Sequence, residues 1–224
     1  MARGSGRATS SPPDESKFAD QCVSRCREAE GRDEIGEYGQ RGLTSTMRRI
    51  EGQLSQGELV PETEKYAIKS SDRFKEKLAK MISDEPAAGP EELASRIADG
   101  VRYTFLFQDE EYAASVIGTC DLLASAGFDL YERKNAWADE SKSYRGINST
   151  WMDRDSGLLF EVQMHTAASW TAKQESHSEY EIIGSGTAAA EEKSSARIRQ
   201  DQIFARVPTP DGVAEITAYR KEGW

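Results

Sequence analysis

A strictly alternating stretch near residue 160, "LFEVQMHT" (159–166), constrains the fold more than any other part of the sequence. Successive side chains of a strand point to opposite faces, so Glu161, Gln163 and His165 share one face, opposite an apolar face. We expect the polar face to be the solvent-facing one. A carboxylate, an amide and an imidazole in one line exceed what a structural strand requires. The pattern therefore predicts a sheet whose polar face carries a functional site.

The rest of the chain predicts an α+β fold, in which helices flank a small mixed sheet of about four to five strands. β-Branched and aromatic residues predict strands at 101–107, 128–133, 146–152 and 158–165, with a hairpin turn at 153–157 and a short strand in "VAEITAY" near the end. Helices are predicted at 17–56 with a break near 31–42, and at 62–82, 91–98, 110–126, 167–182 and 188–205. Thr166 is the expected N-cap of the helix that follows the alternating strand.

Three regions are predicted from the composition along the 224 residues. Residues 1–16 are rich in Gly, Ser, Arg and Pro and predict a disordered leader. Residues 17–60 form an N-terminal helical region, and residues 61–224 form the main domain. No segment approaches the roughly 20 apolar residues that cross a bilayer, so no membrane partner is expected.

Charge and cysteine content narrow the function classes. A formal net charge of −10 disfavours broad electrostatic binding of nucleic acid, which needs a basic face. With 3 Cys and 2 His, a zinc site with four protein ligands is disfavoured. Cys22 and Cys26 are spaced one helical turn apart, so they are either free thiols or a strained disulfide, with Cys120 left over.

A basic stripe is predicted on the 62–82 helix. Its cations recur every four residues, at Lys65, Lys69, Arg73 and Lys77. Four like charges on one stripe repel each other unless water or an anion relieves them, and a polyphosphate is one such anion. A solvated helix face is the alternative on spacing alone.

Charged and polar groups also gather around the strand at 101–107 and the loop that precedes residue 148. Asp99 precedes that strand and Arg102 lies on it, where an arginine is costly unless it faces a site or a partner. The loop "KNAWADESKSYRGIN" offers Lys134, Lys142, Arg145, Tyr144 and Asn148, a set that suits a nucleotide. Glu161 can bind Mg²⁺ or accept a proton from a hydroxyl group.

Five segments in order resemble the synthetase domain of the RelA/SpoT homologues, which transfer pyrophosphate from ATP to a nucleotide 3′-hydroxyl. They are "IKSSDRFKEKL" (68–78), "DGVRYT" (99–104), "SYRGIN" (143–148), "FEVQMHT" (160–166) and "AKQESHSEYE" (172–181). The resemblance implies the nucleotidyltransferase-like fold of that synthetase. The stretches "RYT", "KNAW", "YRGIN" and "FEVQMHT" are most similar in sequence to the single-domain actinobacterial and toxin-like branch. This branch includes the secreted streptomycete nucleotide 3′-pyrophosphokinases. Secretion is therefore slightly favoured over a cytoplasmic location.

The chain departs from the housekeeping pattern at several positions. Gly146 and Asn148 stand where those enzymes have Ser and His, and His165 stands where they have Arg. The family's metal-binding Asp usually lies five residues before the strand arginine, where this chain has Ile97, so Asp99 is the expected ligand at a shorter spacing. The two histidines both lie within the synthetase-like part, so a His-Asp hydrolase domain is not expected.

The resemblance implies a role for each site residue. The donor ATP is held by Lys69, Arg73, Lys77, Arg102, Lys134 and Lys142, and Mg²⁺ by Asp99 and Glu161. The acceptor is held by Tyr144, Asn148, Gln163 and His165, with the Tyr144 ring stacked on its base. Glu161 takes the proton of the 3′-hydroxyl while that oxygen attacks the β-phosphorus and AMP leaves.

The expected partners are ATP and a purine nucleotide acceptor, and the expected state is a monomer or small homo-oligomer. Two other functions stay open: a toxin that pyrophosphorylates the 3′ end of tRNA, and a non-catalytic relative that only binds nucleotides. Stacking contacts the flat face of a base and not its hydrogen-bonding edge. We therefore expect adenine and guanine nucleotides to serve equally well as acceptors.

Overall fold

A mixed β-sheet organises the chain in the computed structural model, which describes residues 15–30, 42–139, 141 and 143–224. Within these residues the sheet has six strands in the order β1-β2-β5-β4-β3-β6. The strands are β1 (Glu58–Leu59), β2 (Arg102–Phe107), β3 (Phe128–Asn135), β4 (Ile147–Asp153), β5 (Leu159–Thr166) and β6 (Tyr219–Arg220). Only β2 and β5 pair in parallel. The predicted α+β class is confirmed, with two short edge strands in addition to the four main strands.

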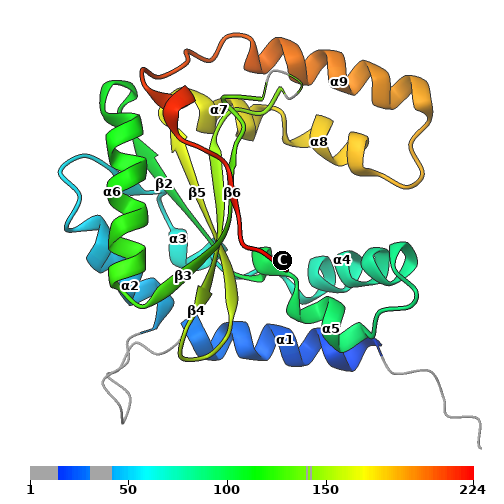
Figure 1. The fold of residues 1–224 in the computed structure, drawn as a ribbon. Helices are drawn as coiled ribbons and strands as arrows, with labels where there is room; N and C mark the ends of the chain where they lie inside the picture. Colours follow the sequence, from blue (N-terminus) through cyan, green and yellow to red (C-terminus); the bar gives the residue numbers. More distant parts are fainter. Residues whose placement is uncertain (1–14, 31–41, 140, 142) are drawn as a thin grey trace, which may run out of the picture.

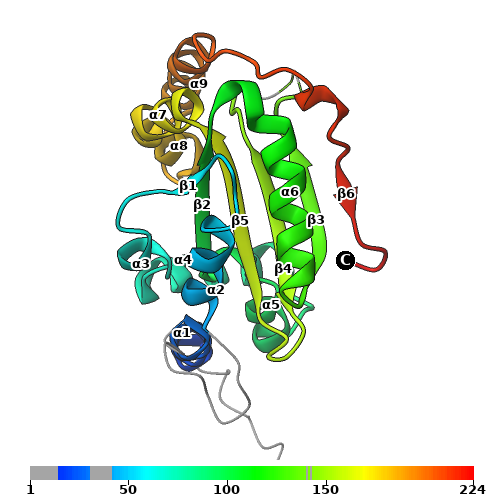
Figure 2. The ribbon, with the colours of Figure 1, turned by 90° about the vertical axis from the view of Figure 1, so that its left-hand side faces the viewer.

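Helices flank the sheet on both sides (Figures 1 and 2). The α-helices are α1 (Glu15–Glu30), α2 (Leu43–Glu51), α3 (Thr63–Tyr66), α4 (Ser71–Asp84), α5 (Pro90–Ser95), α6 (Tyr112–Ser125), α7 (Ala167–Glu175), α8 (His177–Gly184) and α9 (Ala190–Phe204). Short 3₁₀ turns cover Ala98–Gly100, Asp109–Glu111 and Val213–Glu215. Helix α6 covers one side of the sheet, whereas α7, α8 and α9 lie on the other side at one end and α4 and α5 at the opposite end.

The predicted helix at 62–82 is wrong in one respect, because it is interrupted between α3 and α4. Residues 67–70 run alongside the start of β2: Ile68 forms an isolated bridge with Val101, and the Arg102 N–H donates to the Ala67 carbonyl at 2.8 Å. The side chain of Ser70 then caps α4. Local helix propensity carries no information about such pairing with a strand more than 30 residues further along the chain.

Two further boundaries differ from the sequence prediction. The helix predicted at 167–182 is divided at Ser176 into α7 and α8. The segment "VAEITAY" begins with the 3₁₀ turn Val213–Glu215, and only its last residue belongs to the two-residue strand β6. The Thr166 N-cap is confirmed: its side chain accepts from the Ser169 N–H, and the Ser169 side chain accepts from the Thr166 N–H. The predicted leader at 1–16 lies almost wholly outside the described residues.

Two apolar clusters hold these elements together. The larger one packs the apolar face of the sheet against α6 and α2 and includes Trp151, Phe160 and Val162. The smaller one joins α1, α4 and α5 through Val23, Phe74, Leu78, Leu93 and Ile97. Helix α4, which carries two of the predicted cations, is thus held by its own small core.

The three cysteines are free thiols in the structure. Burial raises the pKa of Cys26 to about 11, so this thiol is inert at neutral pH. Among the described helices, none combines the length and apolarity needed to span a bilayer.

We expect Leu78→Ala to lower the free energy of unfolding by about 2–5 kcal/mol, because it opens a cavity in the small core that holds α4. Leu78 is 1% exposed. Ile117→Ala, on the exposed side of α6 at 51% exposure, is the matched control and should change stability by about 0.5 kcal/mol or less. Urea unfolding measures both, and equal effects would contradict the assignment of Leu78 to a core.

Candidate active site

The register of the sheet gathers the predicted site residues in two adjacent rows on one face. In the first row Arg102 on β2 lies opposite Glu161 on β5, and Glu161 lies opposite Thr150 on β4. In the next row Gln163 on β5 lies opposite Asn148 on β4, which lies opposite Lys134 on β3. The parallel pairing of β2 with β5 therefore brings together groups that are 59 residues apart in sequence.

The centre of the site is a cluster of ion pairs around Arg102. Its Nε donates to Glu161 Oε2 at 3.1 Å, and its terminal nitrogen donates to Asp99 Oδ2, also at 3.1 Å. From the segment before α4, Lys69 Nζ lies 3.0 Å from Asp99 Oδ2, and from α4 itself Lys77 Nζ lies 2.5 Å from Asp99 Oδ1. The strand and the helix side thus meet at one carboxylate.

This cluster carries three cations against two carboxylates, so it has an excess of positive charge. Burial acts to raise the pKa of Asp99, but Lys77 and Lys69 outweigh it and hold that pKa at about 2. Burial acts to lower the pKa of Arg102, while Glu161 and Asp99 raise it above its ordinary value. Asp99 and Arg102 are therefore both charged at neutral pH, in a place where an anion would complete the charge balance.

Asp99, and not the residue at position 97, is the carboxylate that the turn before β2 delivers to this cluster. Ile97 is 5% exposed and belongs to the small core with α4. Asp99 lies in the 3₁₀ turn that follows, three residues before Arg102. The shorter spacing in this chain is therefore compatible with a carboxylate beside the strand arginine.

A lysine that the sequence analysis did not single out reaches the same face from α7. Lys173 Nζ donates to Gln163 Oε1, and Gln163 Nε2 donates to Glu161 Oε1 at 2.7 Å. The ammonium also lies 4.4 Å from the centre of the Trp170 ring. Burial lowers the pKa of Lys173 to about 7; repulsion by Arg102 acts in the same direction and attraction by Glu161 opposes it. Lys173 lies within the quoted "AKQESHSEYE" segment, but no spacing rule distinguishes it there.

Three of the residues predicted to hold the acceptor form a second, neutral network next to this cluster. The Tyr144 hydroxyl donates to Asn148 Oδ1 at 2.7 Å and lies 2.9 Å from His165 Nε2, and His165 Nδ1 lies 2.8 Å from the Ser169 hydroxyl. His165 is fully buried, and burial lowers its pKa well below the usual value, with Lys173 acting in the same direction. The imidazole is therefore neutral.

The expectation that the polar face of β5 is solvent-facing is wrong for Gln163 and His165. Gln163 is 4% exposed and His165 is 0% exposed. The reason is that α7, which packs on β5, covers this end of the strand. An alternating pattern specifies which side chains share a face but not what lies over that face.

Several predicted donor residues lie away from the central cluster. Arg73 on α4 pairs with Glu181 on α8 at 2.5 Å, and Lys134 pairs with Glu132 at 2.7 Å. Lys142 lies outside the described residues. Lys65 is on α3, separate from the α4 stripe, and its Nζ lies 3.7 Å from Glu62.

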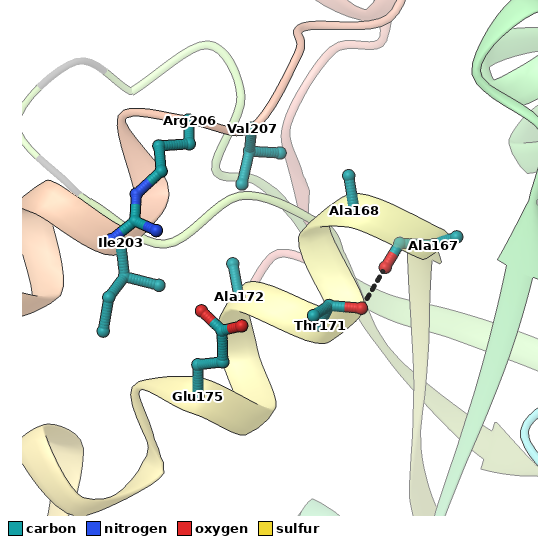
Figure 3. A pocket seen from close by; sticks show the side chains of 8 residues that line it. All are labelled: Ala167, Ala168, Thr171, Ala172, Glu175, Ile203, Arg206 and Val207. Carbon is teal, nitrogen blue, oxygen red and sulfur yellow. Dashed lines mark hydrogen bonds between the residues drawn. The ribbon is translucent and has the colours of Figure 1, made fainter.

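A cavity of about 390 Å³ lies elsewhere, between α7 and the end of α9 (Figure 3). It is lined by Ala167, Ala168, Thr171, Ala172, Glu175, Ile203, Arg206 and Val207. No residue of the central cluster lines it, so the cavity and the charged site are separate features.

Comparison with known proteins supports the fold assignment. No protein-family model matches the sequence, and no curated protein matches it either. Among solved structures, small alarmone synthetase 1 from Bacillus subtilis bound to its product pppGpp is similar, with a TM-score of 0.55, 15% identity, and coverage of 84% of this chain and 92% of that chain. A GTP pyrophosphokinase family protein from Streptococcus pneumoniae has a TM-score of 0.50 at 16% identity, with coverage of 87% and 89%. The chain has the fold of the small alarmone synthetases.

We expect Gly146→Ser to destabilise the protein by about 1–3 kcal/mol, because the site has no room for a side chain. A Cβ at Gly146 would lie 2.8 Å from His165 Cε1 and 3.0 Å from the Tyr144 hydroxyl. Gly118→Ser on α6 is the control, since a Cβ there meets nothing within 4 Å. In a double-mutant cycle, His165→Ala should reduce the cost of Gly146→Ser. An undiminished cost would show that the crowding lies elsewhere.

Proposed function

We propose that this chain is a nucleotide 3′-pyrophosphokinase, a synthetase that transfers the β,γ-pyrophosphate of ATP to the 3′-hydroxyl of a purine nucleotide and releases AMP. The observation that carries the proposal is the cluster of Lys69, Lys77 and Arg102 around Asp99 and Glu161, placed on the polar face of a sheet with this fold. The relative from Bacillus subtilis is described as bound to its product pppGpp, which is a product of this kind of transfer.

The cations of this cluster explain how the donor ATP would bind. A triphosphate supplies the negative charge that this cluster lacks, and it competes with Asp99 for the lysines. Arg102 adds the planar donor pair that suits phosphate oxygens. Arg73 reaches the same anion once it leaves Glu181, because both residues of that pair are about half exposed and such pairs are weak. Lys134 and Lys142 complete the donor set that the sequence predicts.

The two carboxylates fit Mg²⁺, which takes one or two protein carboxylates and completes its coordination with substrate phosphate oxygens and water. Asp99 and Glu161 are both mostly buried and are joined through Arg102. Among the described residues no group of three or more His, Cys, Asp or Glu side chains could hold a metal; in this proposal, substrate phosphates and water would supply the remaining ligands. When bound, Mg²⁺ would supply charge neutralisation at the transferring phosphates.

Glu161 is the proposed general base. One of its oxygens accepts from Arg102 and the other from Gln163, so the carboxylate is held on both sides. It takes the proton of the 3′-hydroxyl as that oxygen forms a bond to the β-phosphorus of ATP. The bond between the β-phosphorus and the α,β-bridging oxygen breaks, and AMP leaves with that oxygen. Positioning and charge neutralisation supply the rest of the catalysis.

Tyr144 is the proposed platform for the acceptor base. Its hydroxyl is held by Asn148 and His165, and an edge contact with Phe204, at 5.9 Å between ring centres, limits the tilt of the ring. Because both His165 nitrogens are within hydrogen-bond distance of protein hydroxyls, its part in acceptor binding runs through Tyr144. Stacking accepts adenine and guanine alike, so ATP is expected to serve as both donor and acceptor.

The test of this function is product analysis. The protein is incubated with Mg²⁺ and ATP alone, or with ATP plus GTP, GDP or tRNA, and the products are separated. We expect AMP and a 3′-pyrophosphorylated adenine nucleotide with ATP alone. Product only after addition of GTP or GDP would restrict the acceptor to guanine, and product only with tRNA would identify the toxin-type reaction. No AMP under any condition would overturn the proposal.

Glu161→Gln should lower the rate of transfer by about 100-fold or more, because an amide is a poor proton acceptor and carries no charge for a metal. Binding of a non-hydrolysable ATP analogue, measured by calorimetry, should change little. The control is Asp129→Asn on β3, which breaks the exposed ion pair of Asp129 with Arg154 and should keep full activity. Retention of more than a few per cent of activity in Glu161→Gln would remove Glu161 from the role of base.

Opposite changes in the KM for ATP are expected on the two sides of the donor site. Lys69→Ala removes a phosphate partner and should raise this KM. Glu181→Gln removes the nearer of the two carboxylates that pair with Arg73, the other being Glu76 at 3.5 Å, and should lower the KM by up to about fivefold, the worth of an exposed ion pair. Glu85→Gln, which breaks the remote pair with Arg96, is the control. A change in the acceptor KM instead would mean that donor and acceptor sites are exchanged.

A further inference from the structure

Lys173 occupies a position that a lysine does not take without a partner. It comes from α7 and is half-buried between the Trp170 ring and the polar face of β5. A cation in such a place costs free energy unless polar groups compensate it. The partner here is the side-chain oxygen of Gln163, which is itself 4% exposed.

The two neighbours of Gln163 determine the direction of its amide group. In its protonated form a lysine side chain only donates hydrogen bonds, and an ionised carboxylate only accepts them. Lys173 faces one end of the amide and Glu161 faces the other. Only one orientation satisfies both: Oε1 toward Lys173 and Nε2 toward Glu161. The reverse orientation would leave the amide oxygen against a carboxylate and its N–H groups against an ammonium.

We propose that Lys173 is a positioning residue that locks the Gln163 amide, so that its N–H group donates to Glu161 and fixes the direction of that carboxylate. Glu161 is thereby held from two sides, by Arg102 on β2 and by the Gln163–Lys173 pair. The part of this proposal that concerns catalysis rests on the proposed function. The structural part, that Lys173 sets the amide orientation, does not.

The geometry separates Lys173 from the donor cations. Lys69, Lys77 and Arg102 all contact Asp99, whereas Lys173 contacts Gln163 on the other side of Glu161. The Trp170 ring, which also contacts the His165 ring at 5.6 Å between centres, lies under the Lys173 ammonium. Loss of Lys173 is therefore expected to affect the turnover number and to leave the KM for ATP nearly unchanged.

The kinetic test compares Lys173→Met, Lys173→Arg and the control Lys221→Met. Lys221 is matched because its ammonium also lies over an aromatic ring, 4.1 Å from the centre of Tyr131, and it is outside the site. Lys173→Met should lower kcat by about 10- to 100-fold, the usual cost of losing a residue that orients an active-site ligand. Lys173→Arg should recover most of it, because arginine also only donates, and Lys221→Met should match the wild type. An unchanged kcat, or a rise confined to the KM for ATP, would overturn the proposal.

A second measurement does not depend on activity. In protein labelled with ¹⁵N at glutamine side chains, the Gln163 amide signal is assigned by its absence in Gln163→Glu. We expect this signal to move in Lys173→Met, to be restored in Lys173→Arg, and to be unaffected in Lys221→Met, with thermal unfolding confirming that each variant is folded. An unmoved signal would refute the role of Lys173 even if activity fell. A moved signal in a protein without any transfer activity would refute only the proposed function.

Discussion

The site depends on the two ion pairs that Arg102 forms, one with Asp99 and one with Glu161. The pair with Glu161 exists because β2 and β5 pair in parallel in a register that sets Arg102 opposite Glu161. Side chains have a period of two along a strand, so a slip of one residue would move Arg102 to the apolar face, against α6 and α2. The charged cluster and the apolar core are thus specified by the same register. A change in the register of β2 against β5 would therefore disrupt the charged cluster and the apolar core together.

The cluster also explains why α4 requires a separate small core. The helix delivers Lys77, and the segment before it delivers Lys69, to a carboxylate of the sheet, yet a cluster with unbalanced positive charge does not itself hold a helix in place. Phe74 and Leu78, on the face of α4 next to Lys77, pack against α1 and α5 and supply the apolar contact. Under the proposed function, this arrangement would let the lysines exchange Asp99 for an incoming anion while α4 stays in place.

Much of the fold could be predicted from the sequence, because period-two alternation and turn residues depend on local chemistry. The four main strands, α6, the Thr166 cap and the shared face of Glu161 and Gln163 follow from such signals. The break at 67–70 could not be predicted, because it results from pairing with a distant strand. The place of Lys173 could not be predicted either, since it depends on how α7 lies over β5. The burial of His165 has the same origin, and the Arg73–Glu181 pair depends on the mutual position of α4 and α8.

The network around Tyr144 differs from the charged cluster around Arg102 in the kind of force that holds it. Tyr144 is oriented by an amide and a neutral imidazole, and the imidazole is oriented in turn by the Ser169 hydroxyl. The His165 ring fits there because Gly146 has no side chain to meet it. Gly146 thus leaves room for the His165 ring, and Asn148 and His165 both hold the Tyr144 hydroxyl. Under the proposed function, this neutral network would orient the Tyr144 ring but would not neutralise acceptor phosphates. Contacts to those phosphates would then come from cations elsewhere on the face, so the base platform and the phosphate contacts would be independent parts of the same site.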